Sequence, residues 1–201
     1  MKAIAGKEIR VIEPTPDFRK MVESALTVSN PEYARKQKMG KWVGGTPSTI
    51  KFYRTEGKDI VLPFGCLREY VFKNIKDVEA DFPEVKHVEY TEDVPLYEYQ
   101  DEAVEEALDK RNGILVAPCG SGKTQMGLAI AREISKPTLW ITHTKDLMVQ
   151  AEERAKSIFD LPKEAYGEIT EGKVNVGTHL TFSTVQTLAR VNLDNLKFGC
   201  V

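Results

Sequence analysis

Eight consecutive residues, Ala117–Thr124, combine the residue types that bind a nucleotide phosphate. They read Ala-Pro-Cys-Gly-Ser-Gly-Lys-Thr. The glycines allow tight turns that aim backbone amides inward, and a helix that begins near Lys123 adds the positive end of its dipole. The Lys123 amine is expected to reach the β- and γ-phosphates, and the Thr124 hydroxyl to bind magnesium. The predicted phosphate-binding residues are Gly120, Ser121, Gly122, Lys123 and Thr124, of which the last two are also the catalytic candidates.

Two elements must flank this loop if it is to hold a phosphate. Residues 113–117 read Gly-Ile-Leu-Val-Ala, which is typical of a short buried strand. Residues 126–134 carry apolar side chains at helical spacing, so the glycines fall at a strand-to-helix turn. A Gly/Ser-rich turn with a chance Gly-Lys-Thr is the competing interpretation, and the flanking elements disfavour it.

The first position of the loop departs from the general G-x-x-x-x-G-K-[ST] pattern, because it is Ala117. The form A-x-x-G-x-G-K-T resembles the nucleotide-binding motif of superfamily 2 helicases and DNA translocases. This resemblance implies a RecA-like P-loop NTPase domain, with ATP and Mg²⁺ as cofactors and DNA as partner, whether duplex, single-stranded or branched. DNA is favoured over RNA because the motifs look more like the repair and restriction-motor branch than like RNA helicases with Asp-Glu-Ala-Asp.

A second motif precedes the loop. Residues 96–100 read Leu-Tyr-Glu-Tyr-Gln and lead into a helix with an acidic outer side. In superfamily 2 a Leu-Arg-x-Tyr-Gln element stands about this far ahead of the phosphate loop, and its glutamine reads the adenine edge. Gln100 matches that glutamine, and Tyr97 replaces the usual arginine, which leaves stacking on adenine possible. Taken alone, Tyr97 and Tyr99 are equally well explained as core anchors.

Two further motifs stand where predicted strands end. Residues 138–142 are typical of a buried strand, and residues 180–183 are expected to form a second strand. The residues at the end of each strand resemble motifs that grip the nucleic-acid backbone in these motors. Simple helix capping explains the first motif almost as well, and an ordinary strand-to-helix turn explains the second. The candidate backbone-binding residues are Thr142, Thr144, Lys145, Thr184 and Gln186.

The alternation of strand and helix predicts an α/β fold with a parallel sheet and flanking helices. We expect the strands at 113–117, 138–142 and 180–183 to be parallel, with the binding loops at their carboxyl ends. Leu196–Val201 reads as the start of another strand. In the family such a strand carries an Asp-Glu pair, which does not follow here. The resemblance thus implies an incomplete motor domain that binds nucleotide weakly and turns it over negligibly.

Positive charge is concentrated at the front of the chain. Residues 1–58 hold 12 Lys+Arg against 6 Asp+Glu, whereas residues 59–113 hold 6 against 15. The densest basic part could contact phosphates and stack a base, although a solvated helix face is the default interpretation of such a run. Its candidate nucleic-acid-binding residues are Arg35, Lys36, Lys38, Lys41 and Trp42.

Composition favours a soluble cytoplasmic protein. No run approaches a transmembrane span, and three scattered cysteines fit a reducing compartment and share no metal-ligand spacing. Residues 1–93 are expected to form a small α+β accessory domain that can contact DNA, with a strand at Glu8–Ile12, a helix at Leu67–Ile75 and a strand at Val85–Tyr90. The resemblance implies that residues 94–201 form a partial first RecA-like domain. The resemblance thus implies the N-terminal part of an ATP-dependent DNA helicase or translocase. A non-catalytic DNA-binding or regulatory protein that keeps only a nucleotide pocket is the alternative, and a P-loop phosphotransferase is disfavoured.

Overall fold

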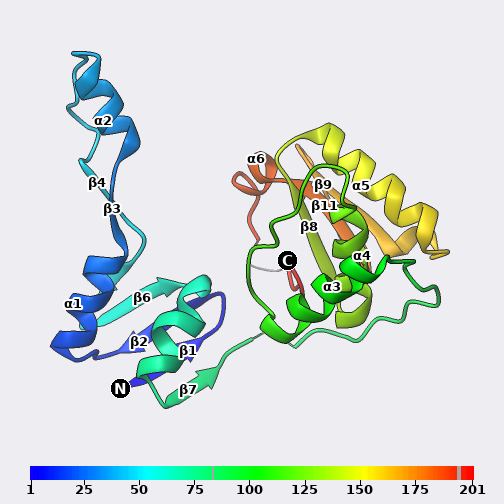
Figure 1. The fold of residues 1–201 in the computed structure, drawn as a ribbon, viewed down its shortest axis with the longest axis horizontal. Coiled ribbons are helices and arrows are strands. Elements are labelled where there is room, and N and C mark those ends of the chain that lie inside the picture. Colours follow the sequence, from blue (N-terminus) through cyan, green and yellow to red (C-terminus); the bar gives the residue numbers. More distant parts are fainter. Residues whose placement is uncertain (83, 194–195) are drawn as a thin grey trace. The chain divides into compact units, whose positions relative to one another are not determined.

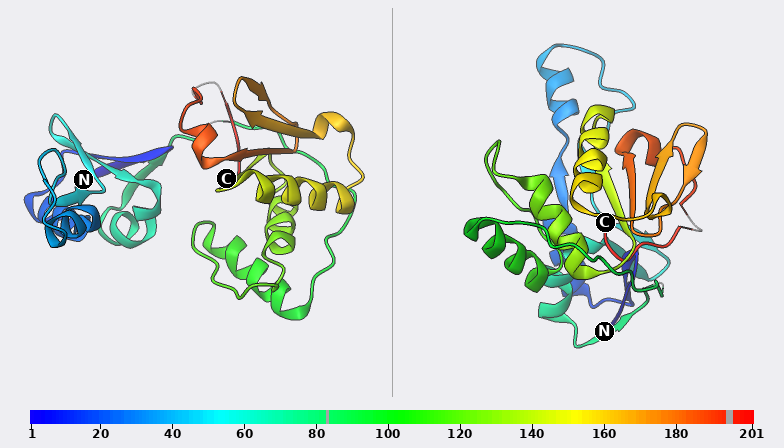
Figure 2. Two further views of the ribbon diagram at one scale, coloured as in Figure 1. Left: turned by 90° about the horizontal axis from the view of Figure 1, so that it is seen from above. Right: turned by 90° about the vertical axis from the view of Figure 1, so that its right-hand side faces the viewer.

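The computed structural model describes residues 1–82, 84–193 and 196–201. The chain forms two compact units, Met1–Phe82 and Pro83–Val201. Each unit has its own sheet (Figures 1 and 2). Each also has its own hydrophobic core.

The first unit is built on a five-stranded sheet in the order β5-β6-β2-β1-β7. Its neighbours are antiparallel except β1 and β7, which run parallel. The strands are β1 (Lys2–Ala5), β2 (Glu8–Ile12), β5 (Arg54–Glu56), β6 (Asp59–Pro63) and β7 (Asp77–Ala80). Alternation of apolar and polar residues predicted β2 with these bounds, because one face of the strand is buried and the other is not.

Helical segments cover the apolar face of this sheet. The α1 helix (Pro16–Ala25) begins where the Thr15 hydroxyl accepts a hydrogen bond from the Phe18 amide. A 3₁₀ turn, Phe64–Cys66, leads into a π-helix, Leu67–Phe72, within the predicted helix at Leu67–Ile75. The core that these elements bury contains Ala3, Ile9, Val11, Phe18, Val22, Ile60, Leu62, Cys66, Val71 and Ile75.

A two-stranded antiparallel ribbon leaves this unit separately from the sheet. It is made of β3 (Thr27–Ser29) and β4 (Thr49–Lys51), and it carries α2 (Pro31–Lys38) away from the sheet (Figure 1). We call residues 27–51 the arm. The α2 helix has no buried residue, so the arm is held by its ribbon and by polar contacts rather than by a core.

The second unit contains a four-stranded sheet in the order β10-β9-β11-β8. The central strand β11 runs parallel to both β8 and β9, and β10 is antiparallel to β9. The strands are β8 (Thr138–Thr142), β9 (Tyr166–Thr170), β10 (Lys173–Asn175) and β11 (Leu180–Thr184). The predicted parallel relation of the strands at 138–142 and 180–183 is confirmed.

Helices lie on both faces of this sheet. On one face α4 (Lys123–Ile134) and α5 (Lys145–Ile158) pack on β11 through Leu128, Met148 and Phe182. On the other face α6 (Val185–Leu188) and the segment around Phe198 cover Leu139 and Ile169. The α3 helix (Glu98–Lys110) packs on α4, and a 3₁₀ turn, Lys163–Ala165, precedes β9 (Figure 2).

The predicted strand at 113–117 is not formed. Residues 113–118 have no regular structure, and the side chains of Ile114 and Val116 are each 92% exposed. A strand needs a partner strand for its backbone hydrogen bonds. At the outer edge of β8 the partner is Cys200, which forms an isolated parallel bridge with Thr138, rather than residues 113–117. No strand among the described residues pairs with 113–117.

Two other predicted strands are also wrong or much shorter. Residues 85–90 form no strand, because the Val88 amide donates to the carbonyl of Ser135 in a loop and the Tyr90 ring packs against Phe159. Of Leu196–Val201, only Cys200 pairs with the sheet. Among the described residues no helix is both long and apolar enough to cross a membrane.

Candidate functional site

The phosphate loop has the backbone geometry that its glycines predict. Gly120 and Gly122 both have φ of +80°, in the left-handed region that favours glycine, and α4 begins at Lys123 directly after them. Gly122 is also confined sterically, since a Cβ there would lie 2.3 Å from Nε2 of Gln100. The sequence therefore places the free amides of a 12-residue helix next to a turn that only glycine fits.

Lys123 is folded back over the loop. Its Nζ donates to the carbonyl oxygens of Ala117 (3.0 Å) and Pro118 (2.8 Å). The ammonium is thus held by two neutral acceptors at the loop itself, and a phosphate oxygen would be a stronger partner. Thr124 follows it within the first turn of α4.

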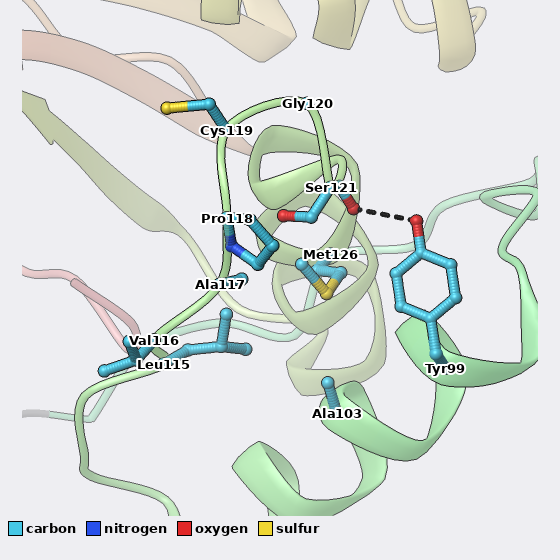
Figure 3. A pocket seen from close by; sticks show the side chains of 10 residues that line it. All are labelled: Tyr99, Ala103, Leu115, Val116, Ala117, Pro118, Cys119, Gly120, Ser121 and Met126. Atoms are coloured by element: carbon cyan, nitrogen blue, oxygen red, sulfur yellow. Dashed lines mark hydrogen bonds between the residues drawn. The ribbon is translucent and has the colours of Figure 1, made fainter.

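The motif at residues 96–100 contacts the phosphate loop directly. Gln100 is 4% exposed, and its Nε2 donates to the carbonyl of Ser121 at 2.8 Å, while its Oε1 accepts from the Tyr97 amide at 2.9 Å. The Tyr99 hydroxyl donates to the same Ser121 carbonyl at 3.2 Å (Figure 3). In this structure the Gln100 amide is therefore a tether between α3 and the loop, and a contact with adenine requires it to exchange one of these partners.

A pocket of about 500 Å³ opens beside the loop, between α3, α4 and residues 115–121 (Figure 3). Its wall is mainly apolar, with Ala103, Leu115 and Met126 beside Tyr99. The Ser121 Oγ is buried without a hydrogen-bond partner in the loop. An apolar wall of nucleobase size next to an unpartnered hydroxyl and free helix amides suits a nucleotide. Tyr97 stacks on Tyr99 with ring centroids 6.0 Å apart and is 71% exposed, so its outer face is open.

The candidate backbone-binding residues of the second unit are brought together at one edge of the sheet. Thr142 and Thr184 are directly paired in register at the carboxyl ends of β8 and β11. Thr144 caps α5, and the Gln186 Nε2 donates to the His143 carbonyl at 3.1 Å, which joins the two loops. The phosphate loop belongs to the same end of the unit, because α4 starts there and β8 returns along it. Lys145 is the first residue of α5 and is exposed.

The other candidate nucleic-acid-binding residues lie in the arm of the first unit. Arg35, Lys36 and Lys38 are on α2, and Lys41 and Trp42 are in the turn that follows it. Lys36 differs from the rest, because its Nζ is 2.8 Å from Oε1 of Glu32 and 2.7 Å from the hydroxyl of Thr46. Lys36 thus stabilises the arm internally.

Sequence reasoning missed a tether between α4 and α5. Gln125 is buried, and its Oε1 accepts from Arg154 Nη2 at 2.7 Å and from Nε at 3.0 Å, while its Nε2 donates to the Pro95 carbonyl at 2.8 Å. The available signal was a polar residue on the buried side of α4 directly after Thr124. Because it links the helix after the phosphate loop to the helix after β8, this contact fixes the relative position of the two loops.

Comparison with known proteins identifies the family. Residues 93–199, more than half of the chain, match the family described as the type III restriction enzyme, res subunit. The chain belongs to this family. The matched range contains the phosphate loop, the Gln100 motif and both edge loops of the sheet, whereas the arm lies outside it. The expected resemblance to superfamily 2 helicases and translocases is thereby confirmed.

Individual relatives agree with this family. The chain is 30% identical over 129 residues to the DNA 3'-5' translocase XPB2 of Sulfurisphaera tokodaii. The aligned region covers 61% of this chain and 28% of that protein. It is 36% identical over 83 residues to a protein of Acanthamoeba polyphaga mimivirus with the provisional name ATP-dependent RNA helicase L396, covering 41% of this chain and 16% of that protein. The chain therefore spans less than a third of these relatives.

The fold is similar to that of a solved helicase. The crystal structure of the UvsW helicase from bacteriophage T4 superposes with a TM-score of 0.62 at 16% identity, over 96% of this chain and 78% of that one. The similarity confirms the predicted class, an α/β RecA-like fold, and includes the first unit as well as the second. The chain thus belongs to a superfamily 2 family whose members are ATP-dependent helicases and translocases.

Proposed function

We propose that this chain supplies the ATP-binding site and part of the nucleic-acid contact surface of an ATP-dependent DNA helicase or translocase. The observation that carries the proposal is the tethered phosphate loop at the start of α4. It combines two left-handed glycines, a lysine folded onto the loop and the unpartnered Ser121 hydroxyl. The names of the relatives, one a DNA translocase and one an RNA helicase, support a nucleic-acid motor, and the motif pattern favours DNA.

The residues of the loop fit Mg²⁺-ATP. The loop amides and the Ser121 hydroxyl would donate to phosphate oxygens, and Lys123 would exchange its two carbonyl partners for oxygens of the β- and γ-phosphates. Thr124 would hold the magnesium ion. Tyr97 would stack on the adenine while Gln100 orients the loop. Bound ATP supplies the free energy of hydrolysis that drives the motor.

The edge formed by β8 and β11 is the proposed site for the nucleic-acid backbone. The free amides at the start of α5 and the exposed Lys145 can bind phosphate oxygens, and Thr142, Thr184 and Gln186 hold the two loops together. A Lys145→Gln variant should weaken binding to all DNA sequences alike and lower the salt slope of a 20-base-pair duplex by about 1. An unchanged slope would remove Lys145 from the interface.

We also propose that these 201 residues bind nucleotide without steady turnover. Without the Asp-Glu pair and an arginine finger, which alone contributes about 10³ to 10⁵ in rate, hydrolysis should be negligible. Phosphate release above background from the purified chain would contradict this proposal.

Isothermal titration calorimetry with Mg²⁺-ADP tests the nucleotide site. We expect micromolar to millimolar affinity, roughly -8 to -4 kcal/mol, for the parent chain and no measurable heat for Lys123→Ala. Lys163→Ala, which removes an exposed lysine elsewhere in the same unit, is the matched control and should bind like the parent. Equal heats for Lys123→Ala and the parent would mean that the loop is not the phosphate site.

A further inference from the structure

The arm is the most strongly basic segment that the nucleotide site does not use. Residues 27–51 contain five Lys+Arg and one Asp+Glu. The single acid, Glu32, is paired with Lys36, so that Arg35, Lys38 and Lys41 have no ion pair among the described residues. A surface with unpaired cations of one sign attracts a polyanion.

The open face of the nearby sheet gives a direct contrast. There, Arg54 is paired with Glu8 and Glu56, and Arg10 with Glu56 and Asp59. These charges are neutralised within the protein. The excess of positive charge in the front of the chain is therefore available mainly at the arm.

The turn after α2 presents an aromatic ring in a defined position. Trp42 is 83% exposed, yet its ring lies on the backbone of Gly44, where an added Cβ would be 2.0 Å from Cζ2 and 2.3 Å from Cε2 of the indole. The indole is therefore in close contact with Gly44, while most of its surface is open to solvent. Gly40 and Gly45, with φ of +63° and +80°, allow the tight turns that bring Lys41 and the ring together.

Polar contacts hold the arm in shape without a core. The Asn30 side chain accepts from the Glu32 amide at 3.0 Å and donates to the Pro47 carbonyl at 2.8 Å, at the point where the ribbon meets α2. The Lys36 contact with Thr46 joins the later part of α2 to the loop that leads back to β4. The tip is thus pre-organised, which reduces the entropy lost when it binds a partner.

We propose that the arm tip is a stacking site for an unpaired base of single-stranded nucleic acid, with Trp42 as the platform and Arg35, Lys38 and Lys41 as contacts to the flanking phosphates. Base stacking on an exposed aromatic ring beside cations is how sequence-independent single-strand binders work. A duplex would use the cations alone, because its bases are already stacked. The proposal does not depend on the nucleotide site, so it stands or fails separately from Lys123.

An abasic oligonucleotide separates stacking from charge. We would measure binding of a labelled 20-nucleotide oligothymidylate and of a 20-nucleotide abasic strand by fluorescence anisotropy with the full chain. The parent should prefer the oligothymidylate by about 5- to 150-fold, the range of one stacked base. In Trp42→Ala that preference should fall by the same factor, while binding to the abasic strand and to a 20-base-pair duplex stays within about twofold. An unchanged preference in Trp42→Ala would overturn the proposal.

Gly44→Ala tests the support of the ring without changing charge or removing the indole. The new Cβ must displace the ring, so this variant should lose part of the preference for bases. Gly65→Ala, where nothing lies near the added Cβ, is the matched control and should behave like the parent. Circular dichroism would show that each variant is folded. Parent-like preference in Gly44→Ala would contradict the assigned platform geometry.

The cations are tested by neutralisation that spares Lys36. The triple variant of Arg35, Lys38 and Lys41 to Gln should lower the salt slope for the oligothymidylate by about 2, since each single-strand phosphate contact contributes about 0.7. A control that changes Lys7, Lys20 and Lys76 to Gln has the same net charge. An equal fall of the salt slope in the control would mean that the arm is only a general basic surface and would overturn the stacking site. Equal competition by polyglutamate and by the abasic strand against the oligothymidylate would lead to the same conclusion.

Discussion

The phosphate loop and the arm tip both present positive groups to solvent, but they are built in opposite ways. At the loop the donors are mostly backbone amides, and their geometry is fixed by two left-handed glycines and by the Gln100 tether. At the arm the donors are long side chains on a helix with no buried residue. A loop of the first kind selects one ligand geometry, whereas an arm of the second kind suits a partner without fixed sequence.

The largest effect should come from Gly122→Ala. This substitution forces φ of +80° on a residue with a Cβ and brings that Cβ against the Gln100 amide. We expect Mg²⁺-ADP affinity to fall about a hundredfold by calorimetry, with DNA stacking at the arm unchanged. Parent-like nucleotide binding would mean that backbone geometry does not define the loop.

Gln100→Ala tests whether the buried amide of Gln100 tethers the phosphate loop or contacts adenine. If the amide mainly tethers the loop, its loss should weaken Mg²⁺-ADP and inorganic pyrophosphate alike, by about tenfold, because a buried hydrogen bond to Ser121 is lost. A residue that only reads adenine would leave pyrophosphate binding unchanged. Competition binding with both ligands distinguishes these roles, and Glu98→Ala on the exposed side of α3 is the control.

Asn30→Ala should affect the arm and leave the loop intact. It removes the α2 cap and the contact with the Pro47 carbonyl, which together contribute about 1 kcal/mol to local order. Faster amide hydrogen exchange over residues 31–47, with normal Mg²⁺-ADP binding, is the expected result. Ser29→Ala, one residue earlier and exposed, is the control. Unchanged exchange would show that the Asn30 contacts do not hold the arm.

The smallest effect is a pH dependence at the open face of the first sheet. The Arg54 guanidinium lowers the pKa of Glu8 and of Glu56 by hydrogen bonding. A lowered folded-state pKa stabilises the unit above the ordinary value of 4.5, and this contribution is lost as the pH falls through the folded value. In Arg54→Gln the pKa of Glu8, followed by NMR titration, should rise toward its ordinary value. No rise would mean that the pair does not persist in solution.

The sequence predicted those features that depend on local geometry. The loop glycines, the start of α4 and the Thr144 cap follow from residue type and spacing alone, and all are found. The predicted strand at 113–117 was wrong, because a strand forms only beside a partner strand and the pattern of apolar residues does not reveal that partner. The position of Gln125 on the buried side of α4 could be read from the sequence, but its partner could not, because Arg154 lies 29 residues away.

In the arm, too, the sequence indicated the residues but not their arrangement. Its composition was evident, but with no buried stripe on α2 there was no apolar periodicity to define the helix. Gly44 had no evident role until the Trp42 ring was seen to lie on it. Charge and aromatic content therefore identified the candidate residues, and only the fold separated Lys36, which closes the arm, from the cations that face solvent.

Amide hydrogen exchange with and without saturating Mg²⁺-ADP tests the central claim most directly. If the loop at the start of α4 holds the phosphates, residues 119–124 should become strongly protected while residues 31–47 of the arm exchange at the same rate as before. Protection at the arm without protection at residues 119–124, or no protection at either place at a concentration where calorimetry detects binding, would contradict the account.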